Sequence, residues 1–297
     1  MRSVSFCRVN AAFRICQDTA SECTVCLGAC SCLPSASMVE IAAPYEAAWK
    51  ALGVDSVQAA SARFLDSPPP PKTAAIVRPT QMPLPNGGTL EVFYKQYEFA
   101  RPAWKFLGRP SKARCEFQNY ATFAKLGIAC AEPVACGEER DALGRLCRAF
   151  IVTRAIPNAQ TLVEFWSERH ATRCERIALI EQLARWTRRI HDENFFHHDL
   201  VWRNILVNRD NHGTVRLWWI DCPRGARNRW SPLRNRKLLK DLASLDKSAA
   251  RLCSRTERLR FVKTYLSLAR LDAAAKKLIR DELAYRKSRW PEDWHGH

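Results

Sequence analysis

The run from His197 to Val207 constrains the fold of this chain more than any other feature of the sequence. Its letters, HHDLVWRNILV, set the carboxylate of Asp199 a few positions before the amide of Asn204, and an apolar stretch follows. A second apolar stretch comes after a polar turn and ends at Asp221. Carboxylate and amide oxygens in this order supply a proton acceptor and ligands for a hard divalent cation. The pattern predicts that a loop beside two short strands carries the chemistry.

A lysine and a glutamate upstream complete this set. Lys95 lies within an apolar stretch at 90–97 that favours a strand, where a buried charge is costly unless an opposite charge pairs with it. Glu116 lies early on a helix that we expect Ser111 to cap, and it is the natural partner of Lys95. The order is therefore a lysine strand, a glutamate helix, further strands, a long helix, the 197–207 run and an aspartate.

This order is that of a kinase, and the 197–207 run fits the H-x-D-L-x-x-x-N pattern of a kinase catalytic loop. In phosphoryl transfer Asp199 would orient the attacking hydroxyl and accept its proton. Asn204 and Asp221 would hold Mg²⁺, and Lys95, paired with Glu116, would contact the α- and β-phosphates of ATP. Each signal is weak by itself, so the prediction rests on their order and spacing.

We therefore predict an α+β, protein-kinase-like fold of two lobes. The expected divisions are a disordered, cysteine-rich tail at 1–37, a helical leader with a proline-rich segment at 38–72, a small β-rich N-lobe at 73–155 and a larger helical C-lobe at 156–297. Turn residues and hydrophobic spacing predict helices at 44–52, from 110 to 127, at 172–191 and after 238. Strands are expected at 73–78, 90–97, 128–137, 147–155, 195–200, 204–207 and 215–220.

The cysteines fall into two groups. The scattered group, from Cys115 onward, is typical of reduced core residues in a cytosolic protein. The N-terminal group contains C-x-x-C and C-x-C spacings that could bind zinc, but a second pair at loop distance is missing, which favours a tail ahead of a start at Met38. Its members are Cys7, Cys16, Cys23, Cys26, Cys30 and Cys32.

A formal net charge of +17 indicates an anionic partner, and no stretch is apolar enough to span a membrane. Basic residues without any acid fill 222–240, directly after Asp221, so we expect them to flank the acceptor side of the site. Nucleic acid is an unlikely partner because no recognition motif is present. The basic residues of this segment are Arg224, Arg227, Arg229, Arg234, Arg236, Lys237 and Lys240.

Three stretches resemble the Kdo/WaaP lipopolysaccharide kinase family, within the protein-kinase-like fold. They are FYKQYEF with ARCEFQNYATFAKLGIACAEPVACGE, LARWTRRIHDENFFHHDLVWRNILV, and LWWIDCPRG with LLKDLASLDKSA, and together they cover about residues 89–250. The resemblance implies transfer of the ATP γ-phosphate to a hydroxyl of an inner-core sugar, Kdo or heptose. It implies Lys95 and Glu116 for the nucleotide, Asp199 for catalysis, and Asn204 and Asp221 for Mg²⁺.

The resemblance also implies which residue supports the catalytic loop and where in the cell the protein acts. Asp241 matches a family position that buttresses the loop, although a charge near a helix N-terminus would equally explain it. An anionic glycolipid or sugar is the implied acceptor. We accordingly expect a cytoplasmic protein with peripheral contact to the anionic, cytoplasmic face of the inner membrane.

Two departures keep other functions open. No glycine-rich phosphate loop is recognisable, and prolines occupy 66–74 where the phosphate-covering turn is expected. His198 stands where many protein kinases carry an arginine, and little chain follows Asp221 for a peptide-binding platform. The alternatives are another small-molecule or protein kinase, for example one like the aminoglycoside phosphotransferases, and a catalytically inactive kinase-like scaffold.

Overall fold

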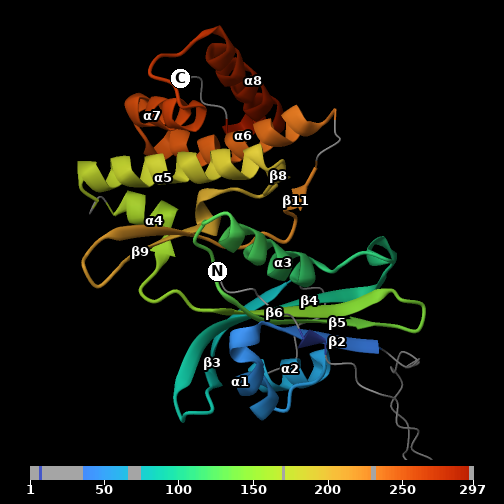
Figure 1. Ribbon diagram of the computed structural model, residues 1–297. Helices are drawn as coiled ribbons and strands as arrows, with labels where there is room; N and C mark the ends of the chain where they lie inside the picture. The colour runs from blue at the N-terminus through green and yellow to red at the C-terminus, as the bar shows by residue number, and fades with distance from the viewer. Residues whose placement is uncertain (1–6, 9–35, 66–74, 169–170, 229–231, 294–297) are drawn as a thin grey trace, which may run out of the picture. The chain divides into compact units, whose positions relative to one another are not determined.

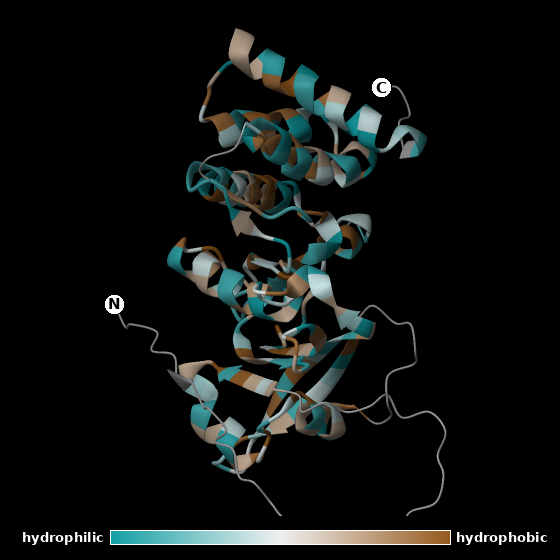
Figure 2. Ribbon diagram, turned by 90° about the vertical axis from the view of Figure 1, so that its right-hand side faces the viewer, coloured by the Kyte–Doolittle hydropathy of each residue, from teal (hydrophilic) through white to brown (hydrophobic). Residues whose placement is uncertain are grey.

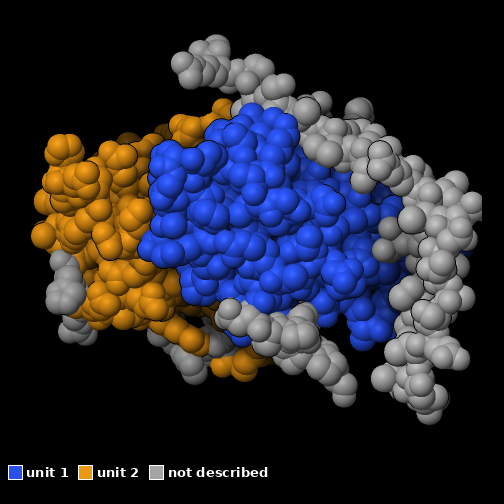
Figure 3. Space-filling model, turned by 90° about the horizontal axis from the view of Figure 1, so that it is seen from below, with its two compact units in different colours: residues 1–117, 132–155 blue, residues 118–131, 156–297 orange. Residues whose placement is uncertain are grey.

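The structure is a computed structural model that describes residues 7–8, 36–65, 75–168, 171–228 and 232–293. The chain divides into two compact units, coloured separately in Figure 3. Unit 1 comprises residues 1–117 and 132–155, and unit 2 comprises residues 118–131 and 156–297. Most of the cysteine-rich segment at 1–37 and the proline run at 66–74 lie outside the described residues, so the predictions for them have no structural counterpart.

Unit 1 is built on an antiparallel sheet with the strand order β1-β2-β5-β6-β4-β3. The neighbouring strands β6 and β4 pair over most of the length of β6, with Lys95 opposite Ile151. The sheet order makes β3 an edge strand among the described residues, which agrees with its prolines, Pro79 and Pro83, because proline lacks a ladder donor. The strands are β1 (Cys7–Arg8), β2 (Ala36–Ile41), β3 (Ile76–Pro83), β4 (Thr89–Ala103), β5 (Pro133–Arg140) and β6 (Leu146–Arg154).

Two short helices cover one face of this sheet, α1 (Glu46–Ala51) and α2 (Val57–Phe64) (Figure 1). Their aromatic side chains interlock with those of β4 and β6: Trp49 stacks on Phe150 with centroids 5.9 Å apart, and Phe64 stacks on Tyr94 at 5.3 Å. Side chains alternate along a strand, so the burial of Tyr94 here turns Lys95 to the opposite face. The aromatic core of unit 1 thus decides on which face the lysine lies.

Helix α3 (Lys112–Lys125) follows β4 and a single turn, η2 (Trp104–Phe106). Ser111 caps it as predicted, because the Ser111 hydroxyl accepts a hydrogen bond from the Arg114 amide at 3.1 Å. Glu138 of β5 accepts a hydrogen bond of 2.6 Å from the Ser111 amide and so ties the start of α3 to the sheet. The division into units falls within α3, after Phe117.

Unit 2 holds two small β-sheets and most of the helices. The first sheet has three strands in the order β10-β9-β7, and the second pairs β11 with β8. The strands are β7 (Gln160–Thr161), β8 (Phe195–Phe196), β9 (Ile205–Arg209), β10 (Val215–Trp219) and β11 (Ala226–Arg227). The helices are α4 (Leu162–Ser167), α5 (Arg173–Asp192), α6 (Arg234–Leu252), α7 (Arg255–Leu266) and α8 (Ala273–Arg289), with single turns η3 (Trp202–Asn204) and η4 (Pro291–Asp293).

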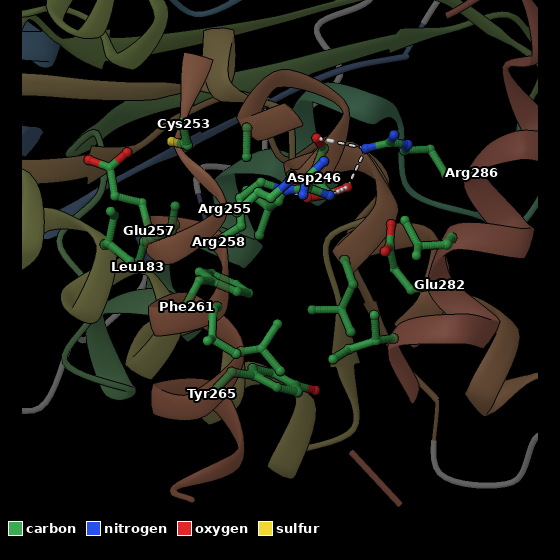
Figure 4. A pocket seen from close by; sticks show the side chains of 18 of the residues that line it. Leu183, Asp246, Cys253, Arg255, Glu257, Arg258, Phe261, Tyr265, Glu282 and Arg286 are labelled. Atoms are coloured by element: carbon green, nitrogen blue, oxygen red, sulfur yellow. Dashed lines mark hydrogen bonds and ion pairs between the residues drawn. The ribbon is translucent and has the colours of Figure 1, made fainter. Parts of the chain in front are cut away.

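Helices α5 to α8 pack through apolar stripes, and Figure 2 shows hydrophobic and hydrophilic residues alternating along them. A cavity of about 410 Å³ lies among these helices. In Figure 4, Phe261 and Tyr265 lie on one side of it, and Glu282 and Arg286 lie on the other. Of the described residues, no helix is long and apolar enough to cross a membrane.

Four predicted elements need correction. The strand expected at 128–137 begins at Pro133, because Ala129 and Ala131 instead form backbone hydrogen bonds with Trp219 in unit 2. The leader expected to be helical from 38 starts with strand β2, which pairs with β5 before the helices begin. Helix α6 starts at Arg234 and not after 238, and the strand expected at 195–200 is limited to β8.

Candidate active site

In unit 1 the structure brings Lys95 and Glu116 together. The Lys95 Nζ lies 3.0 Å from Glu116 Oε2, so β4 and the first turns of α3 form the pair expected from the sequence. Lys95 also lies over the ring of Tyr97, 5.3 Å from its centroid, and the Tyr97 hydroxyl donates to Glu116 at 3.4 Å. Lys95 and Tyr97 contact the Glu116 carboxylate from the same face of the sheet, so Glu116 fixes the direction of the lysine side chain.

In unit 2 the candidate catalytic loop is held by hydrogen bonds among its own residues. Asn204 Nδ2 donates to the carbonyl oxygen of Asp199 at 3.0 Å, and the Val201 amide donates to the same oxygen at 3.0 Å. The Ile220 amide donates to the carbonyl of Asn204 at 3.0 Å and links the loop to the end of β10. Because the amide nitrogen of Asn204 is engaged, its Oδ1 is the end of that side chain that remains for a metal or a phosphate.

Asp221 lies two residues after the end of β10 in a left-handed backbone conformation, with φ 56°. Its amide donates to the Tyr120 hydroxyl at 3.1 Å. The turn after it is held by Asn119, whose Nδ2 donates to the carbonyls of Cys222 at 2.8 Å and Gly225 at 2.9 Å. The part of α3 in unit 2 therefore anchors the aspartate turn on both sides.

Asp241 on α6 supports the catalytic loop through hydrogen bonds to its backbone. Its two carboxylate oxygens accept hydrogen bonds from the amides of His197 at 2.7 Å and His198 at 2.8 Å. Asp241 is fully buried, which works to raise its pKa, but its bond with His191 and its contact with the His197 amide hold the pKa below its usual value. Asp241 is remote from the first turn of α6, so the support of the loop, and not a helix N-terminal charge, explains it.

His197 is buried and its ring nitrogens have no hydrogen-bond partner among the described residues. Its ring stacks on Phe123 with centroids 5.9 Å apart and meets Trp219 edge-on at 5.8 Å. Burial lowers the pKa of His197, although the charges of Asp241, Asp199 and Asp221 act on it in the opposite direction. The buried ring is therefore a packing element of the loop.

Cations on α6 face the catalytic loop. Burial lowers the pKa of the Lys240 ammonium, and the positive charge of Arg224 lowers it further, whereas the charges of Asp241 and Asp199 raise it. The pKa of His198 is likewise lowered by burial and by Lys240. Among the described residues Arg224 and Lys240 have no carboxylate within salt-bridge distance, so their charge is available to an anion.

The donor set in unit 2 fits Mg²⁺ of the kinase type. A kinase binds Mg²⁺ through a carboxylate, an amide oxygen and the phosphates of the substrate, and Asp221 and Asn204 would supply the two protein donors. Among the described residues there is no cluster of three or more histidine, cysteine, aspartate or glutamate side chains that would hold a metal by itself. A metal at this place would depend on the nucleotide for its other ligands.

The whole sequence was compared with models of protein families, and residues 87–265 match the lipopolysaccharide kinase (Kdo/WaaP) family. The chain belongs to this family. The match covers more than half of the chain, and it includes both the Lys95–Glu116 pair and the loop and aspartate of unit 2. This member of the Kdo/WaaP family is a kinase, a phosphotransferase that uses ATP and an alcohol acceptor.

Among solved structures, the chain is similar to WaaP in complex with acyl carrier protein, with a TM-score of 0.61 and 23% sequence identity over 86% of this chain and 99% of that chain. The kinase domain of Mycobacterium tuberculosis PknI matches with a TM-score of 0.37 and 14% identity, over 75% of this chain and 86% of that chain. No curated protein matches the sequence. The family match and the likeness to the WaaP structure confirm the kinase-like α+β fold, with a β-rich and a helical part, that the sequence predicted.

Sequence reasoning missed the residues that hold the aspartate turn. The sequence patterns indicate no functional role for Tyr120, Asn119 or Gly225. A Cβ on Gly225 would lie 2.6 Å from Phe195 Cζ and would also overlap Cys222 Sγ, so the turn accepts only glycine at this point. The signal that could have revealed Gly225 is its position in the Asp-Cys-Pro-Arg-Gly run.

Proposed function

We propose that this kinase transfers the γ-phosphate of ATP to a hydroxyl of a lipopolysaccharide inner-core sugar, Kdo or heptose. The observation that carries the proposal is the family match across residues 87–265, and the order of Lys95, Asp199, Asn204 and Asp221 along the sequence supports it. The family is one of lipopolysaccharide kinases, which supports an acceptor from lipopolysaccharide.

The roles of the residues follow from their contacts. Lys95, directed by Glu116 at 3.0 Å, would neutralise charge on the α- and β-phosphates of ATP. Asp199, whose backbone oxygen is fixed by Asn204 and Val201, would orient the sugar hydroxyl and accept its proton as the oxygen attacks phosphorus. A carboxylate so positioned removes the need for the sugar hydroxyl to ionise before it reacts.

The nucleotide phosphates need a partner for their charge. Asn204 and Asp221 are the residues that would hold Mg²⁺, which when bound supplies electrostatic stabilisation of the phosphates. Asn119 and Tyr120 hold the backbone around Asp221, so the turn that carries its carboxylate is in place before any ligand arrives. We assign this positioning to α3.

Charge favours an anionic acceptor. Arg224 and Lys240 act on the catalytic loop without an ion-pair partner among the described residues, and 222–240 contains no acid. Inner-core sugars bear carboxylates and phosphates, which these cations would attract. A polycationic acceptor such as an aminoglycoside would be repelled at the same place. The charge of this segment therefore supports a sugar kinase of the lipopolysaccharide core over an antibiotic phosphotransferase.

The test is transfer of label from radioactive ATP in the presence of Mg²⁺. Kdo-containing lipid A, a heptose-containing core and an aminoglycoside would be offered separately to the native protein and to Asp199→Asn. We expect label in a lipopolysaccharide acceptor, and a loss of about a thousandfold in Asp199→Asn. Asp192→Asn, an exposed aspartate at the end of α5, is the matched control and should transfer label at the native rate.

Two results would contradict the proposal. Label moving into the aminoglycoside alone would assign the chain to a different class of small-molecule kinase. No label in any acceptor, together with an unchanged melting temperature on addition of ATP and Mg²⁺, would indicate an inactive scaffold, because a ligand that binds only the folded state must stabilise it.

A further inference from the structure

One end of the sheet in unit 1 carries large apolar side chains in contact with water. Trp104 is 59% exposed, Leu143 is 55% exposed and Leu107 is 48% exposed. They are three of only seven large apolar side chains that are exposed among the described residues. Single exposed apolar residues are ordinary, but a group of them marks a contact surface. We call this group, with the exposed cations Arg101, Lys105 and Arg109, the exposed tip.

The exposed tip is formed by two segments that lie at the same end of the sheet (Figure 1). One is the end of β4 with η2, and the other is the turn between β5 and β6. Leu107 approaches the second segment at Gly144, since a Cβ on that glycine would lie 3.3 Å from Leu107 Cδ1. The guanidinium of Arg145 lies 5.0 Å from the centroid of the Trp104 ring. The apolar side chains of the two segments are therefore neighbours.

A hydrogen-bond network centred on the partly buried Arg140 makes the exposed tip rigid. The guanidinium of Arg140 donates to the carbonyls of Phe106 at 3.0 Å, Arg109 at 2.7 Å and Gly144 at 3.1 Å. Glu138 holds the same guanidinium at 2.9 Å. One arginine thus ties both segments together, and the leucines and the tryptophan are presented to solvent on a fixed frame. Preorganisation of this kind reduces the entropy lost on binding.

The charge around these apolar groups is positive. The chain from 99 to 112 contains no acid, and Lys105 lies over the rings of Phe99 at 5.8 Å and Phe106 at 5.4 Å. Among the described residues Arg101, Lys105 and Arg109 have no ion-pair partner. The nearby acid Asp141 is neutralised by Arg145 at 2.6 Å. An occupant of this surface must accept aliphatic groups and offer negative charge.

We propose that the exposed tip docks on the surface of an anionic lipid bilayer. A bilayer interface combines acyl chains that accept leucine, an interfacial layer that favours tryptophan, and anionic headgroups that attract lysine and arginine. Nucleic acid matches the charge but offers no aliphatic region for Leu107 and Leu143. The inference goes beyond the proposed function, because the exposed tip contains no residue of the candidate active site.

Sedimentation with vesicles tests the apolar part. The native protein should bind vesicles of phosphatidylethanolamine and phosphatidylglycerol and should bind phosphatidylcholine vesicles weakly. The combined substitution Trp104→Ser, Leu107→Ser and Leu143→Ser should lower the partition coefficient about tenfold or more. Leu259→Ser, which removes an exposed leucine of α7, is the matched control and should bind like the native protein. Native binding by the triple variant would overturn the proposal.

A second pair of variants tests the charges without touching the apolar groups. Lys105→Glu with Arg109→Glu should abolish binding to the anionic vesicles, whereas Lys276→Glu with Arg280→Glu, an equal charge change on exposed positions of α8, should weaken it only slightly. An equal loss in both pairs would show a general effect of net charge and would contradict docking at the exposed tip. Unchanged melting temperatures would show that the variants fold.

Fluorescence locates the contact itself. Vesicles with brominated lipids should quench part of the tryptophan emission, and Trp104→Phe should remove most of that quenching. Quenching that persists in Trp104→Phe would place the contact at another tryptophan. A concentration-dependent dimer that the triple variant loses, without any vesicle binding by the native protein, would assign the surface to a second copy of the chain.

The outcome is separable from that of the proposed kinase function. In detergent, where the acceptor is dispersed, all variants of the exposed tip should phosphorylate it at the native rate. Loss of vesicle binding with retained transfer supports the inference. Vesicle binding that is retained in a protein without kinase activity would contradict the proposed function and leave the docking surface standing.

Discussion

The candidate residues of unit 1 and unit 2 are held in different ways. In unit 1, Lys95 depends on the side chain of Glu116, an ion pair between neighbouring elements. In unit 2, the catalytic loop depends on hydrogen bonds to its backbone amides, made by Asp241 from a distant helix. A side-chain pair positions one group, whereas bonds to backbone amides fix the path of the chain itself. Unit 2 should therefore couple activity to folding, and unit 1 should not.

The largest effect is expected for Asp241→Ala. The substitution leaves two buried amides without an acceptor and removes the partner of His191, so the free energy of unfolding should fall by about 4 kcal/mol. Phosphate transfer should be lost as well, because the loop that carries Asp199 is no longer supported. Denaturant unfolding and the label-transfer assay measure both effects.

Asp241→Asn serves as the matched variant, since it keeps one acceptor oxygen. It should lose less stability than Asp241→Ala while still losing most of the activity. If both variants unfold like the native protein, the catalytic loop does not depend on α6, and the contrast between the units fails.

Glu282 sharpens the contrast within unit 2, because it is a buried carboxyl with little support. Its Oε1 has no hydrogen-bond partner among the described residues, and burial raises its pKa to about 8, with the charge of Asp246 acting in the same direction (Figure 4). In the unfolded chain the carboxyl loses its proton near its ordinary pKa, so the folded state binds more protons between the two values. Stability should therefore fall as the pH rises from about 5 to about 8.

Glu282→Gln should remove this dependence and should raise the free energy of unfolding at pH 8 by on the order of 3 kcal/mol. Thermal unfolding at a series of pH values measures it. Asp281→Asn, at the neighbouring exposed position on α8, should leave the slope as it is in the native protein. A slope that persists in Glu282→Gln would assign the pH dependence to another group.

A smaller effect is expected at the turn after Asp221. Gly225→Ala would push a methyl group against Phe195 and Cys222 and should cost about 2 kcal/mol of stability. It should also weaken the hydrogen bond from Asn119 to the Gly225 carbonyl, which is 2.9 Å long, and so lower activity. Adding Cys222→Ala removes one of the two overlaps and should restore part of the stability. If the double variant is no more stable than Gly225→Ala, steric overlap at Gly225 is not the reason that the turn requires glycine.

The sequence predicted much of this arrangement for a physical reason. The Lys95–Glu116 pair and the order of the strands follow from local patterns, because alternation and helix capping act over a few residues. The supports in unit 2 join residues far apart in the chain, as with Asn119 and Gly225, and a single sequence contains no signal for such distances. Asp241 was found only through a resemblance, and from its position alone it could equally have been a helix-terminal charge.

The wrongly predicted start of β5 also results from contacts between residues far apart in the sequence. The segment before Pro133 has the composition of a strand, and its hydrophobic pattern predicts one. Its backbone instead bonds with Trp219, a residue of unit 2 that no local pattern connects to it. Tertiary pairing therefore decided the start of β5. The two units differ here too, since unit 1 is built mostly from neighbouring strands and unit 2 from distant segments.

Glu116→Gln should have the smallest effect on stability and so is the sharpest test of the contrast. Glu116 is buried and Lys95 is 15% exposed, but the amide oxygen of glutamine can still accept a hydrogen bond from Lys95, so the substitution should lower the free energy of unfolding by only about 1 kcal/mol. Lys95 would lose its direction, so kcat/KM for ATP should still fall on the order of a hundredfold. Glu91→Gln, an exposed glutamate on the same strand, should change neither quantity. A Glu116→Gln protein that unfolds as readily as Asp241→Ala would show that unit 1 also couples its site to its fold, whereas native kcat/KM would remove Lys95 from nucleotide binding.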